Sequence, residues 1–496
     1  MMRILSWWSL CAILAPLPAL AKTLAAAPPA DATPVFVDEP YRATPPVAGK
    51  PRPAPTPKPQ LFSLKNGIEV ILVERHQLPT VTMEIQLVGG SRLDPPDRRG
   101  RASACTQLWG DGSDKRDKLQ LAEALADLGS SFGASATTEH TSFELATMTR
   151  NLAQTLDLFT EVLLHPGLRP DELGRITGRR KAALLAAKSN PGQLASRLIG
   201  ALAYGPANPR GWLTTDASLS ALRVTDCRAY VDGHGPVGAT LFVVGDITRD
   251  QVVDHLERRL GGWRALGRQD AAPAEIRPVA GTIFLSDVPG AEQSVVAMFH
   301  PGPQRVSQDF DATQVLAAIL SSGFSSRINQ NLREKHGWAY GAGGTYGYSR
   351  DGSVLVIQAS VRADATGPSV REILQEMKTV RESEVSAEEL SREKEGAILS
   401  LPARWSTGRS IGSTFEALRY FGLPWSYYDA FVERVHKVDT AAVLAAARAW
   451  VRPDKAQLLV VGDWSKVRAQ VEGLTADGPW KGAAIVRVGA DGEVLR

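Results

Sequence analysis

Arg333 and Tyr340 are the residues whose types and spacing point most clearly to chemistry. Arg333 falls in the last turn of a predicted helix that Gly337 ends, and Tyr340 follows seven residues later, where a strand should begin. Ser325 or Ser326 can cap that helix at its start. A guanidinium offers a rigid fork of donors to carbonyl or carboxylate oxygens, and a phenol can donate to a developing oxyanion. The alternative is that Arg333 complements the helix dipole and Tyr340 belongs to the core.

A second segment, Gly90 to Trp109, has the pattern of a turn that leads into a chemically active helix, yet it contains no histidine. The eight histidines are dispersed along the chain, with no two within five residues, at His76, His140, His165, His234, His255, His300, His336 and His436. This spacing argues against a local metal motif and leaves a dispersed site as the alternative. Glu139 and His140, at the start of a strand, are expected to form a solvated turn or strand edge, so neither receives a role.

The composition describes a globular protein. The 496 residues are 44% hydrophobic and 22% charged, and length alone favours two or more domains. Lys and Arg number 56 against 53 Asp and Glu, which gives a formal charge of +3 without a long basic run. This balance argues against nucleic acid as a partner.

The N-terminus predicts export. One Arg precedes an apolar run that Pro16 and Pro18 interrupt, and a small-residue cleavage site ends at Ala21. A membrane anchor is the alternative, but the run is short for a spanning helix, so no stable membrane insertion is expected. Beyond the signal, Cys105 and Cys227 are too far apart for a zinc motif, and whether they pair stays open.

The chain repeats itself after a Pro/Ala-rich stretch. ATLFVVGD, which ends at Asp246, and AQLLVVGD, which ends at Asp463, are 217 residues apart, and PDEL and AEEL share that offset at Leu173 and Leu390. Two markers with one offset indicate a duplicated domain of about 210 residues. We therefore predict an α+β fold with two homologous domains, each a β-sheet with helices packed on one face.

The predicted segments are a signal peptide at 1–21, a Pro/Ala-rich linker at 22–60, an N-terminal domain at 61–266, an interdomain linker at 267–281, a C-terminal domain at 282–475 and a C-terminal tail at 476–496.

From Leu61 to Leu474 the sequence resembles the pitrilysin or insulinase-type zinc peptidases, the inverzincins. The residues that carry the resemblance are LKNGIEVILVERHQLPTV, GGSRLDPPDRRG, ATLFVVGD and SSGFSSRINQNLREKHGWAYGAGG. In active members the helix after the GSR turn carries H-x-x-E-H, two zinc-binding histidines and a Glu that acts as general base. The resemblance also implies that the two homologous domains together form half of a clamshell, and that Arg333 and Tyr340 bind the backbone of a peptide substrate.

The same alignment implies that the metal site is lost. The three functional positions of H-x-x-E-H fall on Ser103, Thr106 and Gln107, none of which can bind zinc strongly or accept a proton near neutral pH. The third zinc ligand of the family is a Glu on a later helix, but no acid occurs from Leu173 to Thr215. We expect the three side chains to be polar remnants that face a chamber, and we expect no metal or cofactor in this chain.

The resemblance therefore implies half of an enzyme: a non-catalytic, substrate-binding subunit of a heteromeric zinc metallopeptidase that degrades peptides in the periplasm. The zinc is expected in a partner chain that carries H-x-x-E-H, and the chain alone should be inactive. One alternative is a structural or peptide-binding homologue with no proteolytic role, in which Arg333 and Tyr340 are incidental. Another is a self-sufficient peptidase with relocated metal ligands.

Overall fold

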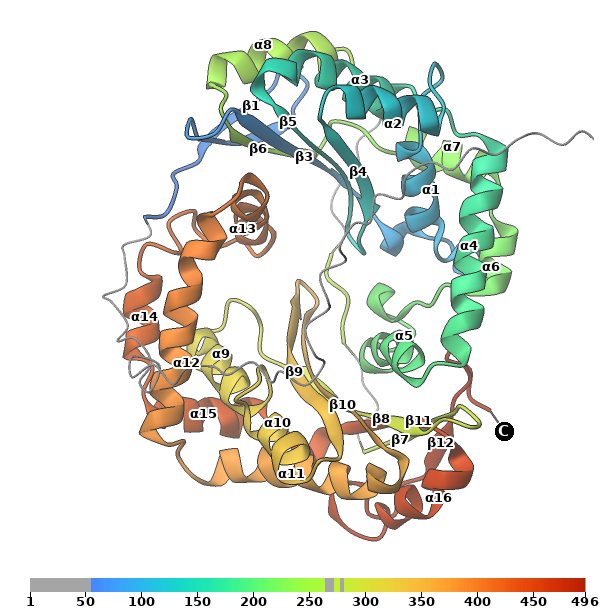
Figure 1. The fold of residues 1–496 in the computed structure, drawn as a ribbon, viewed down its shortest axis with the longest axis vertical. Helices are drawn as coiled ribbons and strands as arrows, with labels where there is room; N and C mark the ends of the chain where they lie inside the picture. The colour runs from blue at the N-terminus through green and yellow to red at the C-terminus, as the bar shows by residue number, and fades with distance from the viewer. Residues whose placement is uncertain (1–54, 264–271, 277–280, 496) are drawn as a thin grey trace, which may run out of the picture. The chain divides into compact units, whose positions relative to one another are not determined.

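The computed structural model of the protein describes residues 55–263, 272–276 and 281–495, all within one compact unit (Figure 1). The predicted signal peptide and most of the Pro/Ala-rich segment lie outside the described residues, as does most of the predicted interdomain linker. The boundaries predicted for the segments stay predictions.

The first half contains a six-stranded mixed sheet in the order β1-β2-β6-β3-β5-β4. Its strands are β1 (Gln60–Ser63), β2 (Glu69–Glu74), β3 (Thr80–Val88), β4 (Ser131–Ala136), β5 (His140–Met148) and β6 (Thr240–Gly245). β1 and β2 form an antiparallel hairpin around Asn66-Gly67, where Gly67 has a φ of 91° that favours glycine. β2 and β6 are parallel, and the other neighbouring strands are antiparallel.

The second half repeats this sheet in the order β12-β7-β11-β8-β10-β9. Its strands are β7 (Ile283–Asp287), β8 (Gln293–Gly302), β9 (Ala339–Ser349), β10 (Gly352–Arg362), β11 (Gln457–Gly462) and β12 (Ile485–Arg487). The predicted C-terminal tail contributes β12, which pairs in parallel with β7.

Helices complete each half. The first half contains α1 (Arg101–Gly110), α2 (Lys118–Asp127), α3 (Leu152–Leu164), α4 (Pro170–Lys188), α5 (Pro191–Tyr204), α6 (Asp216–Ala221), α7 (Val224–Asp232) and α8 (Arg249–Leu260). The second contains α9 (Phe310–Leu320), α10 (Arg327–Asn329), α11 (Thr366–Glu382), α12 (Ala387–Ser400), α13 (Gly408–Tyr420), α14 (Phe431–Lys437), α15 (Thr440–Trp450) and α16 (Trp464–Gly473).

The duplication is visible in the spacing of equivalent elements. β6 and β11 begin 217 residues apart, and so do α4 and α12, and α5 and α13. Apart from the edge strands β1 and β12, both sheets have the same strand order, and both halves carry helices in the same succession, so the α+β fold with two homologous domains is confirmed.

The two halves exchange one helix each, as Figure 1 shows for α5 and α13. α5 belongs to the first half by sequence, but its Leu194 and Leu198 share a core with Phe299 and Leu459 of the second sheet. α13 belongs to the second half, and its Phe415 shares a core with strands β2 and β6 of the first sheet. Each sheet is therefore covered on one face by its own helices and on the other by a helix from the opposite half.

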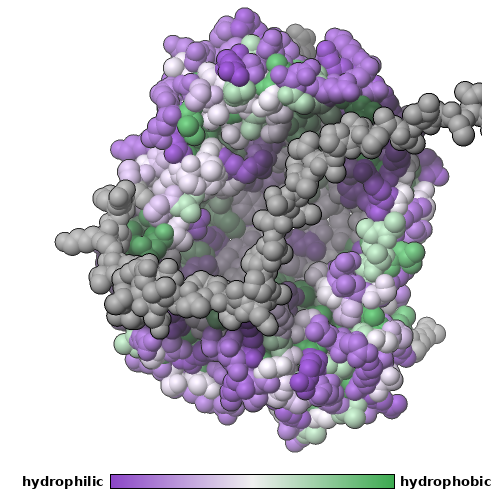
Figure 2. All heavy atoms as spheres, viewed as in Figure 1, coloured by the Kyte–Doolittle hydropathy of each residue, from purple (hydrophilic) through white to green (hydrophobic). Residues whose placement is uncertain are grey.

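The outer face of α4 carries apolar residues at the surface. Ala182, Ala183 and Ala186 are exposed, and Leu185 is 71% exposed. Figure 2 shows this as a hydrophobic patch at the right-hand edge, on a surface that is otherwise mostly hydrophilic. None of the described helices has the length and apolar character needed to cross a membrane.

Candidate functional site

The turn before α1 positions the helix where the sequence pattern placed chemistry. The Asp94 carboxylate accepts hydrogen bonds from the backbone N–H groups of Gly100 and Ala102, at 2.9 and 2.8 Å. Gly100 has a φ of 94°, and a Cβ there would lie 2.6 Å from Thr214. The carboxylate therefore takes the place of an N-cap side chain at a position that only glycine occupies without strain.

A disulfide bond ties α1 to α7. Cys105 and Cys227 are both fully buried and are bonded to each other, which settles the question that the sequence left open. The bond closes a loop across 122 positions of sequence. A cross-link of this kind restricts the unfolded chain and commonly contributes about 2–4 kcal/mol to stability.

The three positions that match H-x-x-E-H do not all face a chamber. Thr106 lies on the buried face of α1 and is fully buried, which corrects the expectation that its side chain faces a chamber. Ser103 and Gln107, one helical turn apart, lie partly exposed on the other side of the helix. Both of these side chains accept hydrogen bonds from Arg180 on α4.

Arg180 occupies the space between α1 and α4. Its guanidinium donates to the Ser103 hydroxyl at 2.7 Å, to the Ser103 carbonyl at 3.1 Å and to the Gln107 side-chain carbonyl at 3.0 Å. Burial, with the positive charge of Arg179 nearby, lowers the pKa of Arg180 from its ordinary value. The side chains of Ser103 and Gln107 therefore serve as acceptors for a fixed positive charge.

These residues do not fit a zinc ion. A hydroxyl and an amide are weak zinc ligands, and the guanidinium that they hold would repel a cation. Across the described part of the chain, no group of three or more His, Cys, Asp or Glu side chains is arranged to hold a metal.

Arg333 and Tyr340 are brought together in the second half. Arg333 lies in the π-helical turn Gln330–Lys335 that continues α10, and Tyr340 is 87% exposed near the start of β9. The Arg333 guanidinium lies 5.3 Å from the centre of the Tyr340 ring and 4.7 Å from that of Phe324, itself 63% exposed. Such cation–π contacts hold a long side chain in place, and Nε of Arg333 also forms an ion pair with Glu334 at 3.2 Å.

The helix that carries Arg333 differs in one detail from its prediction. Ser326 stands at the N-cap position, but its hydroxyl donates to the Gly323 carbonyl instead of capping the helix. The Ser325 hydroxyl donates to Glu393. The predicted end is confirmed, because Gly337 follows the last turn with a φ of 64°.

Glycines follow Tyr340 on the same strand, in the sequence GAGG. A Cβ on Gly344 would lie 2.3 Å from the Val356 carbonyl oxygen of β10, whereas Gly341 and Gly343 have no neighbour closer than 3.4 Å. Gly344 is therefore required by close packing within the sheet, not by a ligand.

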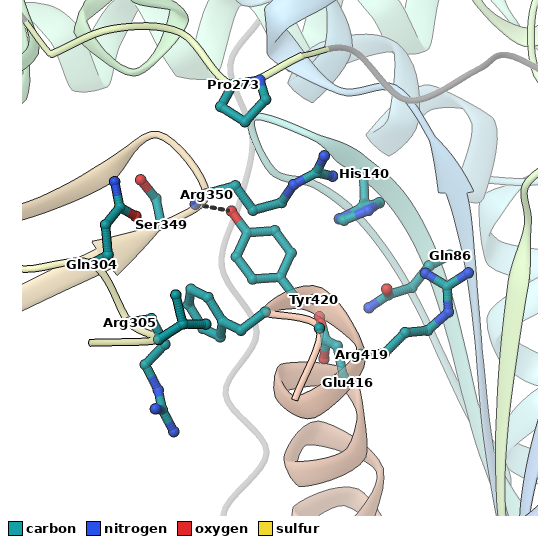
Figure 3. Close-up of a pocket in the computed structure, with 13 residues that line it drawn as sticks. Gln86, His140, Pro273, Gln304, Arg305, Ser349, Arg350, Glu416, Arg419 and Tyr420 are labelled. Atoms are coloured by element: carbon teal, nitrogen blue, oxygen red, sulfur yellow. Dashed lines mark hydrogen bonds between the residues drawn. The ribbon is translucent and has the colours of Figure 1, made fainter. Parts of the chain in front are cut away.

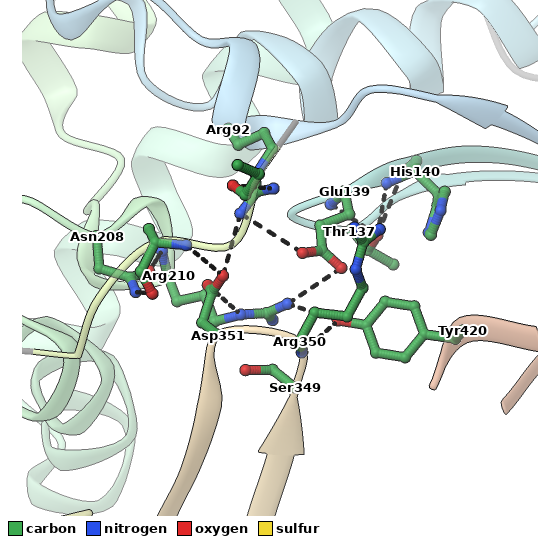
Figure 4. A network of polar contacts seen from close by, with 12 residues as sticks. Arg92, Thr137, Glu139, His140, Asn208, Arg210, Ser349, Arg350, Asp351 and Tyr420 are labelled. Atoms are coloured by element: carbon green, nitrogen blue, oxygen red, sulfur yellow. Dashed lines mark hydrogen bonds and ion pairs between the residues drawn. The ribbon is translucent and has the colours of Figure 1, made fainter. Parts of the chain in front are cut away.

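A buried network of four charges joins the two halves (Figure 4). Asp351, in the turn between β9 and β10, is within 3.3 Å of Arg92 and 3.0 Å of Arg210, and it accepts a hydrogen bond from the Ala274 N–H at 2.7 Å. Glu139 forms ion pairs with the same two arginines, at 3.5 and 3.3 Å. Glu139 is only 2% exposed, so the expectation of a solvated turn is wrong for this residue.

Beside this network lies a polar cavity of about 470 Å³, lined by both halves (Figure 3). Gln86 and His140 line it from the first sheet, and Tyr420 and Glu416 from α13. The Tyr420 hydroxyl accepts a hydrogen bond from the Arg350 backbone N–H at 3.2 Å.

Glu416 is the titratable group of this cavity with the strongest shift. Burial, together with the negative charges of Glu84 and Glu144, raises the pKa of Glu416 to about 7. Glu84 and Glu144 are direct partners on β3 and β5, so three carboxyl groups meet where α13 covers the first sheet.

The sequence alone did not identify four residues of these sites: Arg180, Arg210, Asp351 and Glu416. The signal for Arg180 was present, because α4 carries basic residues in a stretch without acids. Glu416, Asp351 and Arg210 gave no local signal, since their partners lie far away in sequence.

Comparisons with known proteins agree with this architecture. The profile described as insulinase, peptidase family M16, matches residues 69–207, and the profile described as the peptidase M16 inactive domain matches residues 234–397. This chain belongs to the insulinase family.

Among relatives in the insulinase family, an uncharacterized zinc protease of Rickettsia felis is 24% identical over 67% of this chain and 81% of its own length. A non-peptidase homolog of Helicobacter pylori is 22% identical over 75% of this chain and 86% of its own. A peptidase M16 inactive domain from Pseudomonas fluorescens has a TM-score of 0.74 at 22% identity and covers 82% of this chain and 98% of that one.

The periplasmic protease PqqL from Escherichia coli has the same fold, with a TM-score of 0.68 at 14% identity. It covers 82% of this chain, but the match spans only 46% of the PqqL chain. The profile of the inactive domain covers much of the second half of this chain, and the solved structures share its fold.

We predict that Arg180 opposes metal binding even when ligands are restored. In the variant Ser103→His with Gln107→His, zinc affinity should rise at least about tenfold when Arg180→Ala is added, because removal of a nearby positive charge relieves repulsion of the ion. Arg179→Ala, which alters an exposed arginine on the same helix, is the control. Competition with a chromophoric chelator measures the affinity, and equal affinity with and without Arg180 would contradict the assigned role.

We also predict a pH dependence of stability from Glu416. Because its pKa is raised in the folded state, the folded chain holds more protons than the unfolded chain between about pH 4.5 and 7, and stability falls as pH rises through this range. Glu416→Gln should remove this loss, so its stability relative to wild type should increase by on the order of 2 kcal/mol from pH 4.5 to pH 8. Urea unfolding at both pH values measures the difference, and an unchanged difference would refute the shift.

Proposed function

We propose that this protein is the non-catalytic, substrate-binding subunit of a heteromeric zinc metallopeptidase that degrades peptides in the periplasm. The observation that carries the proposal is a contrast between two places in the chain. The place that matches the metal site holds Arg180, whereas a partly exposed Arg333 lies against the exposed ring of Tyr340, where a ligand could reach both.

The missing chemistry would come from a partner chain with H-x-x-E-H and zinc. The match to only 46% of the PqqL chain supports this, because a protease of this fold extends over about twice the length that this chain matches. A second chain of similar size would supply the remainder, including the metal.

In the assembled enzyme the peptide would lie extended, as an added strand on a sheet edge. The Arg333 guanidinium would donate to backbone carbonyl oxygens of the peptide, and the Tyr340 hydroxyl would donate to the oxygen that gains negative charge during hydrolysis. The stack of Arg333 between two aromatic rings supports this role, because it reduces the conformational entropy lost on binding.

Two features support a periplasmic location. The N-terminus has the pattern of a signal peptide, and the Cys105–Cys227 disulfide is typical of proteins in an oxidising compartment. The periplasmic protease PqqL shares the fold.

The central test is reconstitution with a sister chain. The protein is purified alone, and also together with an H-x-x-E-H chain encoded beside its gene, and peptide hydrolysis is measured for each chain and for the mixture. We expect the protein alone to be inactive and the mixture to exceed the sister chain alone. Unassisted hydrolysis by this chain, with one tightly bound zinc, would overturn the proposal, and a mixture no more active than the sister chain would favour a structural or peptide-binding homologue.

Within an active pair, Arg333→Ala and Tyr340→Phe should each lower turnover about a hundredfold, because each removes a donor to the reacting peptide. Lys335→Ala, two positions from Arg333 and mostly exposed, is the control and should stay near wild type. Size-exclusion chromatography checks that each variant still assembles. Full activity in both the Arg333 and Tyr340 variants would remove these residues from the mechanism.

A further inference from the structure

A second cavity, of about 410 Å³, lies between α9, α12, α13 and the segment that follows α13. Its lining is mainly apolar and rich in aromatic rings, which belong to Phe310, Phe421, Tyr427, Tyr428 and Phe431. A cavity of this size and lining suits a bulky apolar group. None of the residues with a role in the proposed function lines it.

The charges around this cavity are not balanced. Its two carboxylates are neutralised by neighbours, since Asp311 pairs with Arg434 at 2.9 Å and Glu393 pairs with Arg392 at 2.9 Å. Its arginines, Arg305 and Arg404, have no carboxylate partner among the described residues. The cavity therefore carries excess positive charge, which an anionic group on a ligand would complement.

Arg305 is placed to bind such a group. Its Cζ lies 3.6 Å from the centre of the Phe310 ring and 4.9 Å from that of Tyr427, both of which line the cavity. Figure 3 shows its side chain extending away from Tyr420 and Glu416 of the polar cavity. A guanidinium stacked on a ring keeps its N–H edge available for a bidentate bond to a carboxylate.

We propose that this cavity binds the C-terminal residue of a peptide, with a bulky apolar side chain among the rings and the free α-carboxylate on Arg305. A bulky apolar group next to a carboxylate is the chemistry that the cavity fits. A free fatty acid offers the same chemistry, so the experiment includes both.

The position of the cavity along β9 favours the peptide. β9 is an edge strand of its sheet, with Tyr340 near its start, and exposed Thr345 of the same strand lines the cavity. Five residues of extended chain cover about 17 Å, so a peptide along β9 could reach from Tyr340 to the cavity. This path rests on the proposed function, but binding of the C-terminal residue needs only this chain, so the two proposals can fail separately.

The experiment uses the full-length chain without a partner. A decapeptide that ends in Phe and carries fluorescein at its N-terminus is titrated, and fluorescence anisotropy gives the dissociation constant. The same peptide with a C-terminal amide should bind about tenfold more weakly, because a charge-assisted hydrogen bond is lost. Equal binding of the acid and the amide would overturn the proposal.

Two pairs of variants locate the binding. Arg305→Gln should weaken the acid about tenfold and leave the amide unchanged, whereas Arg258→Gln, at an exposed site on α8, should change neither. Ala417→Trp places a large ring at an exposed position of the cavity wall and should abolish binding, whereas Ala186→Trp, on the exposed face of α4, should not. Circular dichroism confirms that each variant is folded.

Dodecanoic acid is added as a competitor. Displacement of the peptide only at concentrations far above the peptide's dissociation constant supports the peptide C-terminus as the ligand. Tight binding of dodecanoic acid with no measurable peptide binding would make the cavity a fatty-acid site and overturn the proposal, as would an Arg305→Gln variant that binds the acid normally.

Discussion

A β-sheet with two apolar faces has to be covered on both sides. In this protein the two halves meet that requirement by exchanging one helix each. α5 leaves the first half to cover the second sheet, and α13 leaves the second half to cover the first. Both cavities depend on this exchange, because α13 brings Glu416 and Tyr420 to the polar cavity and Ala417 to the aromatic one.

The buried charges follow from the same arrangement. Where the halves meet, two arginines of the first half share two carboxylates, one from each half, and both carboxylates and Arg92 are almost fully removed from water, whereas Arg210 is partly exposed. Replacement of a whole buried ion-pair network by apolar residues often leaves the stability of a protein unchanged. Removal of a single member is costly, because it leaves the other charges unpaired in a medium of low dielectric. The network therefore determines where the two halves contact each other, and this contact in turn determines the shape of the polar cavity beside it.

Much of the fold could be predicted from the sequence, and the features that could not be predicted were missed for one common reason. The 217-residue offset predicted the repeated fold, and the hairpin at Asn66-Gly67 and the helix Leu152–Leu164 have the turn residues and the periodicity typical of such elements. Glu139 and Arg180 were missed because their partners lie at least 47 residues away, so no local pattern reports them. The destination of α13 was missed because an amphipathic stripe shows that a helix packs on something, without showing on which sheet.

Arg180 also has a consequence for the history of the chain. With Arg180 in place, a histidine introduced at position 103 or 107 would gain no zinc and would remove a side-chain acceptor of the guanidinium. The first substitution on any path to a zinc site would therefore be costly, and a benefit would come only after several more. The order in which substitutions have to occur thus works against a metal site at this helix.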